Sequence, residues 1–121
     1  MGLDTYARPS PEGELTAEDV AAFQAVDAHL CGGIWSGDDG SFRGKVYSDV
    51  VERVTDVSLY QEWIPPETVR AMADAFAHCD PEGVARDLAG EVHATTAVEI
   101  RSLGAFLRVC ADRGLGLAGW W

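Results

Sequence analysis

The residue types that could do chemistry are concentrated between positions 35 and 66. This stretch combines aromatic rings, a few cationic side chains and an acidic Gly-Asp-Asp-Gly turn at 37–40. Aromatic residues together with arginine are typical of surfaces that bind other proteins. We expect a partly exposed groove here, although large aromatic side chains also often fill a protein core. The candidate binding residues are Trp35, Asp38, Asp39, Arg43, Lys45, Tyr47, Tyr60, Glu62 and Trp63.

A small enzyme is the alternative that the same stretch supports. Its site would lie between loop 35–47 and segment 59–67, and a closed pocket with several converging polar groups would favour it over a binding surface. The chain has no Gly-x-Ser-x-Gly sequence and no glycine-rich phosphate loop, so no catalytic residue can be assigned. The candidate groups would be Asp38, Asp39, Arg43, Lys45, Tyr60 and Glu62.

Two sets of residues resemble fragments of metal sites. The segment 38–41 looks like the start of a calcium loop, but the later ligand positions hold Arg43, Gly44 and Lys45. The histidines and cysteines lack the closely spaced pairs that hold zinc. The sequence therefore predicts no metal and no other cofactor. The odd set of cysteines, which we interpret as reduced and mostly buried, is Cys31, Cys79 and Cys110.

The size and charge of the chain narrow the class of protein. Its 121 residues, 47% of them hydrophobic, predict one domain spanning residues 1–121. The formal net charge of −11 argues against binding to nucleic acid or to an anionic membrane, because such a surface repels phosphate. No signal peptide and no apolar run of about 20 residues is visible, so we expect a cytoplasmic protein. An acidic surface that imitates DNA is a second alternative function.

Apolar residues spaced three and four apart predict helices over much of the chain. Two helix starts carry a capping box, in which a Thr side chain and an acidic side chain three residues later satisfy each other's free amides: Thr16 with Asp19, and Thr96 with Glu99. The expected helices run from Thr16 to the Cys31-Gly32-Gly33 segment, from Lys45 to Val57, from Pro65-Pro66 through Phe76, from Asp80 to Gly90, and from Thr96 to Gly114.

Both ends of the chain are expected to be strands. Residues 3–7 alternate in polarity, and residues 115–121 are short, apolar and rich in glycine. Apolar chain ends need a partner, so we expect these two strands to pair with each other. Residues 33–36 and 41–43 flank the acidic turn as a hairpin or an ordered loop. The predicted fold class is α+β, with about five helices packed on a small sheet formed largely by the N- and C-terminal strands.

The opening Met-Gly-Leu-Asp-Thr-Tyr resembles the start of small bacterial and phage-encoded proteins that begin Met-Gly-Leu-Asp-x-Tyr. The block SFRGKVYSDVVERVTDVSLYQEWIPPETV at 41–69 also resembles a segment of small proteins from GC-rich bacterial genomes. This resemblance implies no particular activity, and no catalytic residue is carried over from it.

The preferred function is therefore a binding module that acts on a partner protein or on a second copy of itself, with a homodimer among the expected assemblies. The apolar pair Trp120-Trp121 is a second candidate contact, because such residues are either buried in the sheet or part of an oligomer interface.

Overall fold

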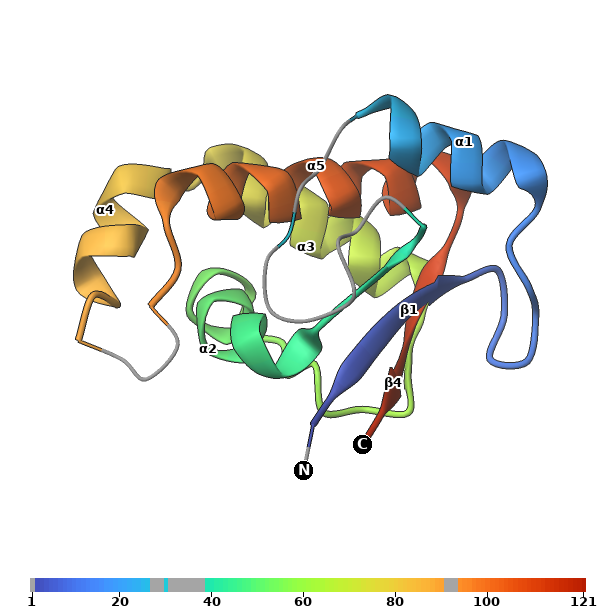
Figure 1. Ribbon diagram of the computed structural model, residues 1–121, viewed down its shortest axis with the longest axis horizontal. Helices are drawn as coiled ribbons and strands as arrows, with labels where there is room; N and C mark the ends of the chain where they lie inside the picture. The colour runs from blue at the N-terminus through green and yellow to red at the C-terminus, as the bar shows by residue number, and fades with distance from the viewer. Residues whose placement is uncertain (1, 27–29, 31–38, 91–93) are drawn as a thin grey trace.

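The computed structural model describes residues 2–26, 30, 39–90 and 94–121 (Figure 1). These residues form both helices and strands, as expected of an α+β protein. The elements are β1 (Asp4–Arg8), α1 (Ala17–Ala25), β2 (Ser41–Phe42), α2 (Gly44–Thr55), β3 (Trp63–Ile64), α3 (Pro66–His78), α4 (Pro81–Asp87), α5 (Ala97–Arg113) and β4 (Gly116–Trp120).

The two chain ends form the centre of the sheet. Its strand order is β2-β1-β4-β3, and every neighbouring pair is antiparallel. Strands β1 and β4 pair along five residues each, with Asp4 opposite Trp120 and Arg8 opposite Gly116. The predicted pairing of the N- and C-terminal strands is confirmed, and so is the fold class.

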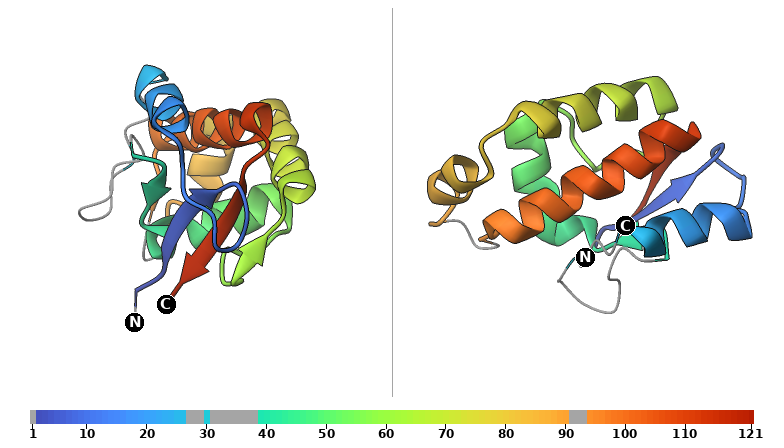
Figure 2. Two further views of the ribbon diagram at one scale, coloured as in Figure 1. Left: turned by 90° about the vertical axis from the view of Figure 1, so that its right-hand side faces the viewer. Right: turned by 90° about the horizontal axis from the view of Figure 1, so that it is seen from above.

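The helices cover one side of this sheet. Strand β1 alternates, so that Leu3, Thr5 and Ala7 are buried while the residues between them are partly exposed. Helix α5 lies over the buried side, between α1 and α3 (Figures 1 and 2). Phe106 on α5 packs against Phe23 of α1 and Phe42 of β2, with ring centroids 4.7 and 5.0 Å apart. These rings join the helices to the sheet at the centre of the core.

Several predicted helix ends are confirmed. Both capping boxes form, at Thr16 and at Thr96. Pro65 caps α3, whose first residue is Pro66, where a missing amide costs no helical hydrogen bond. Gly114 ends α5 in the left-handed conformation with φ of 68°, which glycine adopts without steric cost.

Other boundaries differ from the prediction. Helix α1 ends at Ala25 instead of reaching Cys31, and Val26 is exposed although the apolar spacing had placed it on the buried face. Leu30 is buried although it lies beyond the end of the helix. Its spacing from Phe23 therefore resembled the apolar spacing of a longer helix. Helix α4 ends at Asp87, before the expected stop at Gly90. The expected hairpin strand at 33–36 lies outside the described residues, and β2 pairs with β1.

Strand β3 is absent from the prediction, which treated residues 58–64 as a connection. Two residues are too few to show the alternation that marks a strand. None of the described helices has the length and apolar character needed to cross a membrane.

Candidate functional site

The side of the sheet that faces away from the helices carries the candidate site. The same alternation that buries Leu3, Thr5 and Ala7 directs Asp4, Tyr6 and Arg8 to the opposite side. Because the strands are paired in register, the residues opposite these three on β4 also point outward. We call this side of the sheet the outer face.

Aromatic side chains surround a small residue at the middle of the outer face. Ala118 of β4 lies directly opposite Tyr6 of β1 on one side and Trp63 of β3 on the other. Trp120 lies two residues further along β4 and so projects on the same side. Ala118 therefore forms a low floor between three aromatic side chains.

Glycine at position 116 lets Trp63 lie flat on the outer face. A Cβ atom built on Gly116 would come within 2.6 Å of Cη2 of Trp63 and 2.5 Å of the Ile64 carbonyl oxygen. The Trp63 indole thus covers the β4 backbone at Gly116, and a side chain at position 116 would displace the indole. The small outer residues of β4, Gly116 and Ala118, are what keep this face shallow between β1 and β3.

Two adjoining hollows open beside Trp120. The first, which we call the face hollow, has a volume of about 250 Å³ and is lined by Tyr6, Arg8, Ala118, Gly119 and Trp120. The second, the end hollow, has a volume of about 430 Å³ and is lined by Glu62, Gly119, Trp120 and Trp121. The two hollows share Gly119 and Trp120, so an extended ligand could cross from one to the other over the Trp120 indole.

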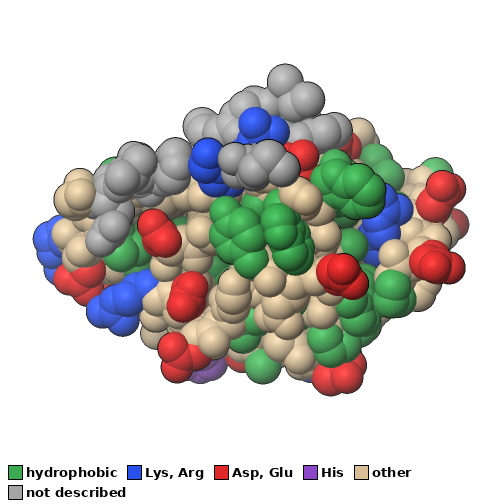
Figure 3. Space-filling model, turned by 90° about the horizontal axis from the view of Figure 1, so that it is seen from below, with side chains coloured by type: hydrophobic (Ala, Val, Ile, Leu, Met, Phe, Trp, Pro, Cys, Tyr) green, Lys and Arg blue, Asp and Glu red, His purple; other side chains and the backbone are tan. Residues whose placement is uncertain are grey.

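The aromatic residues near the end hollow are exposed. Trp120 is 74% exposed, and Tyr60 and Trp121 are also exposed. The rings of Tyr60 and Trp121 meet edge to face, with centroids 5.8 Å apart and planes at 70°. Figure 3 shows the molecule from the side on which the two chain ends lie, with hydrophobic side chains near the middle and acidic ones on several sides. Exposed apolar groups with a polar rim are typical of binding surfaces.

Charges of opposite sign lie at the two hollows. Arg8, at the face hollow, holds its guanidinium 5.3 Å from the centroid of the Tyr6 ring and donates to the carbonyl of Gly13 over 3.0 Å. Glu62, at the end hollow, is exposed and acidic. Burial and then the nearby Asp4 carboxylate raise the pKa of Tyr6, so its phenol stays protonated near neutral pH.

The structure places six of the nine predicted site residues away from these hollows or outside the described residues. Trp35 and Asp38 lie outside the described residues. The Asp39 carboxylate accepts hydrogen bonds from the amide and hydroxyl of Ser41, at 3.1 and 2.7 Å, and supports the turn before β2. Lys45 is exposed on the first turn of α2. Arg43 forms an ion pair with Asp4 over 3.2 Å.

Tyr47 requires a correction, because it is fully buried and cannot line a surface groove. Its phenol donates a hydrogen bond of 2.7 Å to Glu99 of α5, and its ring packs edge to face on Phe42. The spacing of Tyr47, Val50 and Val51 that correctly predicted helix α2 is also the spacing of its buried side.

The remaining three predicted residues lie together at the edge of the sheet. Tyr60, Glu62 and Trp63 come from one short segment that runs beside the end of β4, where the Gly119 amide donates to the Glu62 carbonyl over 3.3 Å. The second predicted contact, Trp120-Trp121, completes this group. Sequence reasoning missed Tyr6, Arg8 and Ala118. The alternation of β1 and its predicted pairing with β4 were the signals that could have placed Tyr6 and Arg8 on one face.

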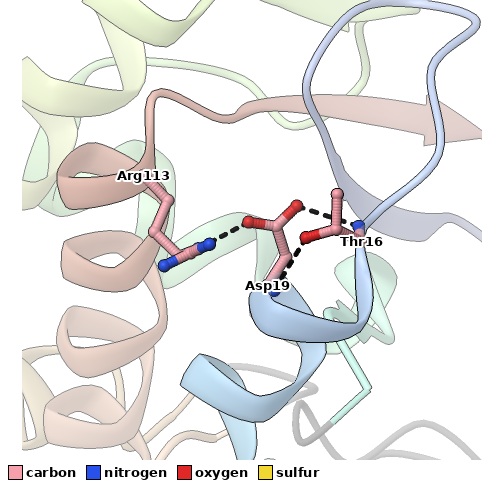
Figure 4. A network of polar contacts seen from close by, with 3 residues as sticks. All are labelled: Thr16, Asp19 and Arg113. Carbon is pink, nitrogen blue, oxygen red and sulfur yellow. Dashed lines mark hydrogen bonds and ion pairs between the residues drawn. The ribbon is translucent and has the colours of Figure 1, made fainter.

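A separate polar network fastens α1 to the end of α5 (Figure 4). Asp19 accepts a hydrogen bond of 3.0 Å from the Thr16 amide and another from the Arg113 guanidinium. Burial raises the pKa of Asp19, but the hydrogen bonds from Thr16 and Arg113 together outweigh burial and hold the pKa below its usual value. This network ties the cap of one helix to the end of another, and we assign it to stability.

The described cysteines are unsuited to reactivity. Burial raises the pKa of Cys110, which lies wholly in the core, far above its usual range. Burial and then the Asp80 carboxylate raise the pKa of Cys79. Within the described part of the chain, no three His, Cys, Asp or Glu side chains are grouped so as to hold a metal ion.

No protein-family model, curated protein or solved structure matches the chain. The candidate site is therefore defined by the geometry of this chain's own residues, and the resemblance to small bacterial proteins stays a prediction.

Proposed function

We propose that this protein is a binding module that holds a partner protein on the outer face of its sheet. The observation that carries the proposal is the position of Trp120, which is 74% exposed and stands between two adjoining hollows. An indole in that position does little for the folded state, because most of its surface remains in water. Trp and Tyr are the side chains that most often supply binding energy at protein interfaces.

The geometry supports a binding module better than the small enzyme considered as the alternative. The enzyme hypothesis needs several of its candidate groups to converge in one pocket. The end hollow is lined by Glu62 of that set, and the hollow beside β2 is lined by Asp39. Arg43 is paired with Asp4, and Lys45 lies on α2. The candidate groups that the structure describes are thus distributed over several elements.

Charge favours a different protein over a second copy as the occupant. Each chain carries a formal net charge of −11, so two copies repel each other at low ionic strength. A partner that is positively charged at the contact is instead attracted to this acidic chain. The experiment must therefore distinguish the binding of a partner protein from self-association through Trp120 and Trp121.

A display library of random peptides of about twelve residues, selected on the immobilised protein, tests the proposal. We expect enriched peptides whose binding is lost with Trp120→Ala and kept with Val98→Ala, which removes another exposed hydrophobic side chain, 68% exposed, from the first turn of α5. Ala118→Lys should also abolish binding by filling the face hollow, whereas Ala71→Lys on the exposed side of α3 should not. Loss of affinity of at least tenfold is expected for a central indole.

Two results would overturn the proposal. One is a selection that enriches nothing, or only peptides indifferent to Trp120 and Ala118. The other is sedimentation showing a tight dimer that Trp120→Ala dissociates, because the outer face would then be occupied by a second copy.

A further inference from the structure

The end hollow has the composition of a site for a cationic side chain. Glu62, whose side chain is acidic and exposed, lines it together with Trp120 and Trp121. A guanidinium or ammonium group is attracted to the face of an indole and pairs with a carboxylate. The surrounding net charge of −11 adds a long-range attraction for such a group and none for an anion.

The face hollow beside it is suited to apolar rings. Its floor is Ala118 and the Gly119 backbone, and its aromatic walls are Tyr6 and Trp120. The Tyr6 phenol stays protonated, as shown above, so neither wall carries charge. Arg8, the charged residue among the described ones that line this hollow, has its guanidinium near the Tyr6 ring and donates to the Gly13 carbonyl. A basic side chain would be repelled from this end and attracted to the Glu62 end, which gives the occupant a direction.

The edges of the sheet leave little room for a partner strand. Strands β2 and β3, which lie at the two edges, have two residues each. Pro65 and Pro66 directly follow β3 and have no amide to donate. Addition of a strand relies on a row of free main-chain groups, so recognition here must come from side chains on the face. An occupant that needs no ladder of main-chain hydrogen bonds is a polyproline II segment.

From these three observations we infer that the partner segment is an extended, proline-rich stretch with one basic residue. Prolines lie over Ala118 in the face hollow, and an Arg or Lys enters the end hollow between Trp120 and Glu62. Polyproline II segments dock in aromatic grooves of this kind because their backbone is already ordered before binding. The shared Trp120 lets both contacts be made by residues that are close in the partner's sequence. The inference rests on the proposed binding function and specifies its ligand.

The test uses three capped peptides titrated into the full chain and followed by isothermal calorimetry and by chemical shifts of the indole N–H groups. The peptides are Ac-PPPRPPP-NH2, Ac-PPPQPPP-NH2, which lacks the charge, and Ac-GGGRGGG-NH2, which lacks the prolines. We expect the first to bind at least about tenfold more tightly than either of the others. That factor corresponds to about 1.4 kcal/mol, and the preference should shrink as salt rises.

Matched variants assign the contacts. Glu62→Gln should reduce the affinity of Ac-PPPRPPP-NH2 to that of the glutamine peptide and leave the affinity of the glutamine peptide unchanged. Glu52→Gln makes the same substitution on the exposed side of α2, in a different hollow, and should change neither affinity. Trp120→Ala should weaken both proline peptides, because its indole lines both hollows.

Equal affinities for the arginine and glutamine peptides, or an unchanged arginine preference in Glu62→Gln, would overturn the inference. So would a random-peptide selection that enriches Trp120-dependent sequences poor in proline and basic residues, and in that case the proposed binding function would stand. A selection that enriches nothing would overturn both.

Discussion

Replacing Asp19 should weaken the attachment of α1 to the rest of the fold. The Asp19 side chain is 9% exposed and serves two purposes, since it completes the capping box with Thr16 and pairs with Arg113 at the end of α5. The Thr16 hydroxyl still caps the helix without Asp19, so what is lost there is the hydrogen bond from the Thr16 amide, which is worth about 1 kcal/mol. The Arg113 side chain is 33% exposed, and solvent screening limits the pair to about 1 kcal/mol. Asp19→Ala should therefore lower the free energy of unfolding by about 2 kcal/mol.

The charge component of this loss can be separated by pH. Folding lowers the pKa of Asp19, so its contribution is fully present above the unfolded value of about 4 and is lost as pH falls through the folded value. Asp19→Asn removes the charge and keeps the shape, and it should cost about 1 kcal/mol at pH 7. The difference between wild type and Asp19→Asn should shrink as pH falls from 5 towards 3, because protonated aspartic acid resembles asparagine there.

Urea unfolding followed by tryptophan fluorescence measures both quantities, with four tryptophans as probes. A loss of about 2 kcal/mol corresponds to a fall of roughly 6 to 10 °C in Tm for a chain of this length. A loss below about 0.5 kcal/mol in Asp19→Ala would show that Asp19 does not hold α1 in place. A constant separation between the wild-type and Asp19→Asn stabilities from pH 7 to pH 3 would show that its charge does not contribute.

Two further substitutions probe the backbone and the core. Gly114→Ala should cost about 1 kcal/mol, because φ is 68° there although a Cβ would meet no atom. Gly90→Ala, with equal space and no positive φ, should be nearly neutral in the same urea unfolding assay; equal losses at both positions would contradict this assignment. Thr5→Val should raise the free energy of unfolding by up to about 1 kcal/mol, since the Thr5 hydroxyl is buried with no hydrogen-bond partner among the described residues. A clear fall in stability in a urea titration would show that this hydroxyl is bonded.

Helices were predictable where a local signal marks each end. The two Thr caps, the Pro65-Pro66 start and the Gly114 end each depend on groups within four residues of one another, so the sequence contains the whole cause. The end of α1 was not predictable in this way. Leu30 is buried by contacts with distant parts of the chain, and its spacing alone made the helix look longer than it is.

The candidate site was only partly predictable, for a related reason. Tyr60, Glu62 and Trp63 are close in sequence and were found together. The face they border also needs Tyr6 and Ala118, which meet only through the register of β1 with β4. The same composition that marked Tyr47 as a surface residue is common in cores, and nothing local separates the two cases.

The pairing of β1 with β4 also constrains how the chain folds. The two strands at the centre of the sheet pair residues that are more than a hundred positions apart in the sequence, whereas each edge strand pairs with one of these two strands alone. Contacts of this separation carry a large loop-closure entropy and slow folding. During synthesis β1 is made before the other strands and can pair early with the two-residue β2, but β4, its partner along five residues, is the last strand of the sheet to be made. The helices can form earlier, and closure of the sheet by its last-made strand is then the step that completes the native structure.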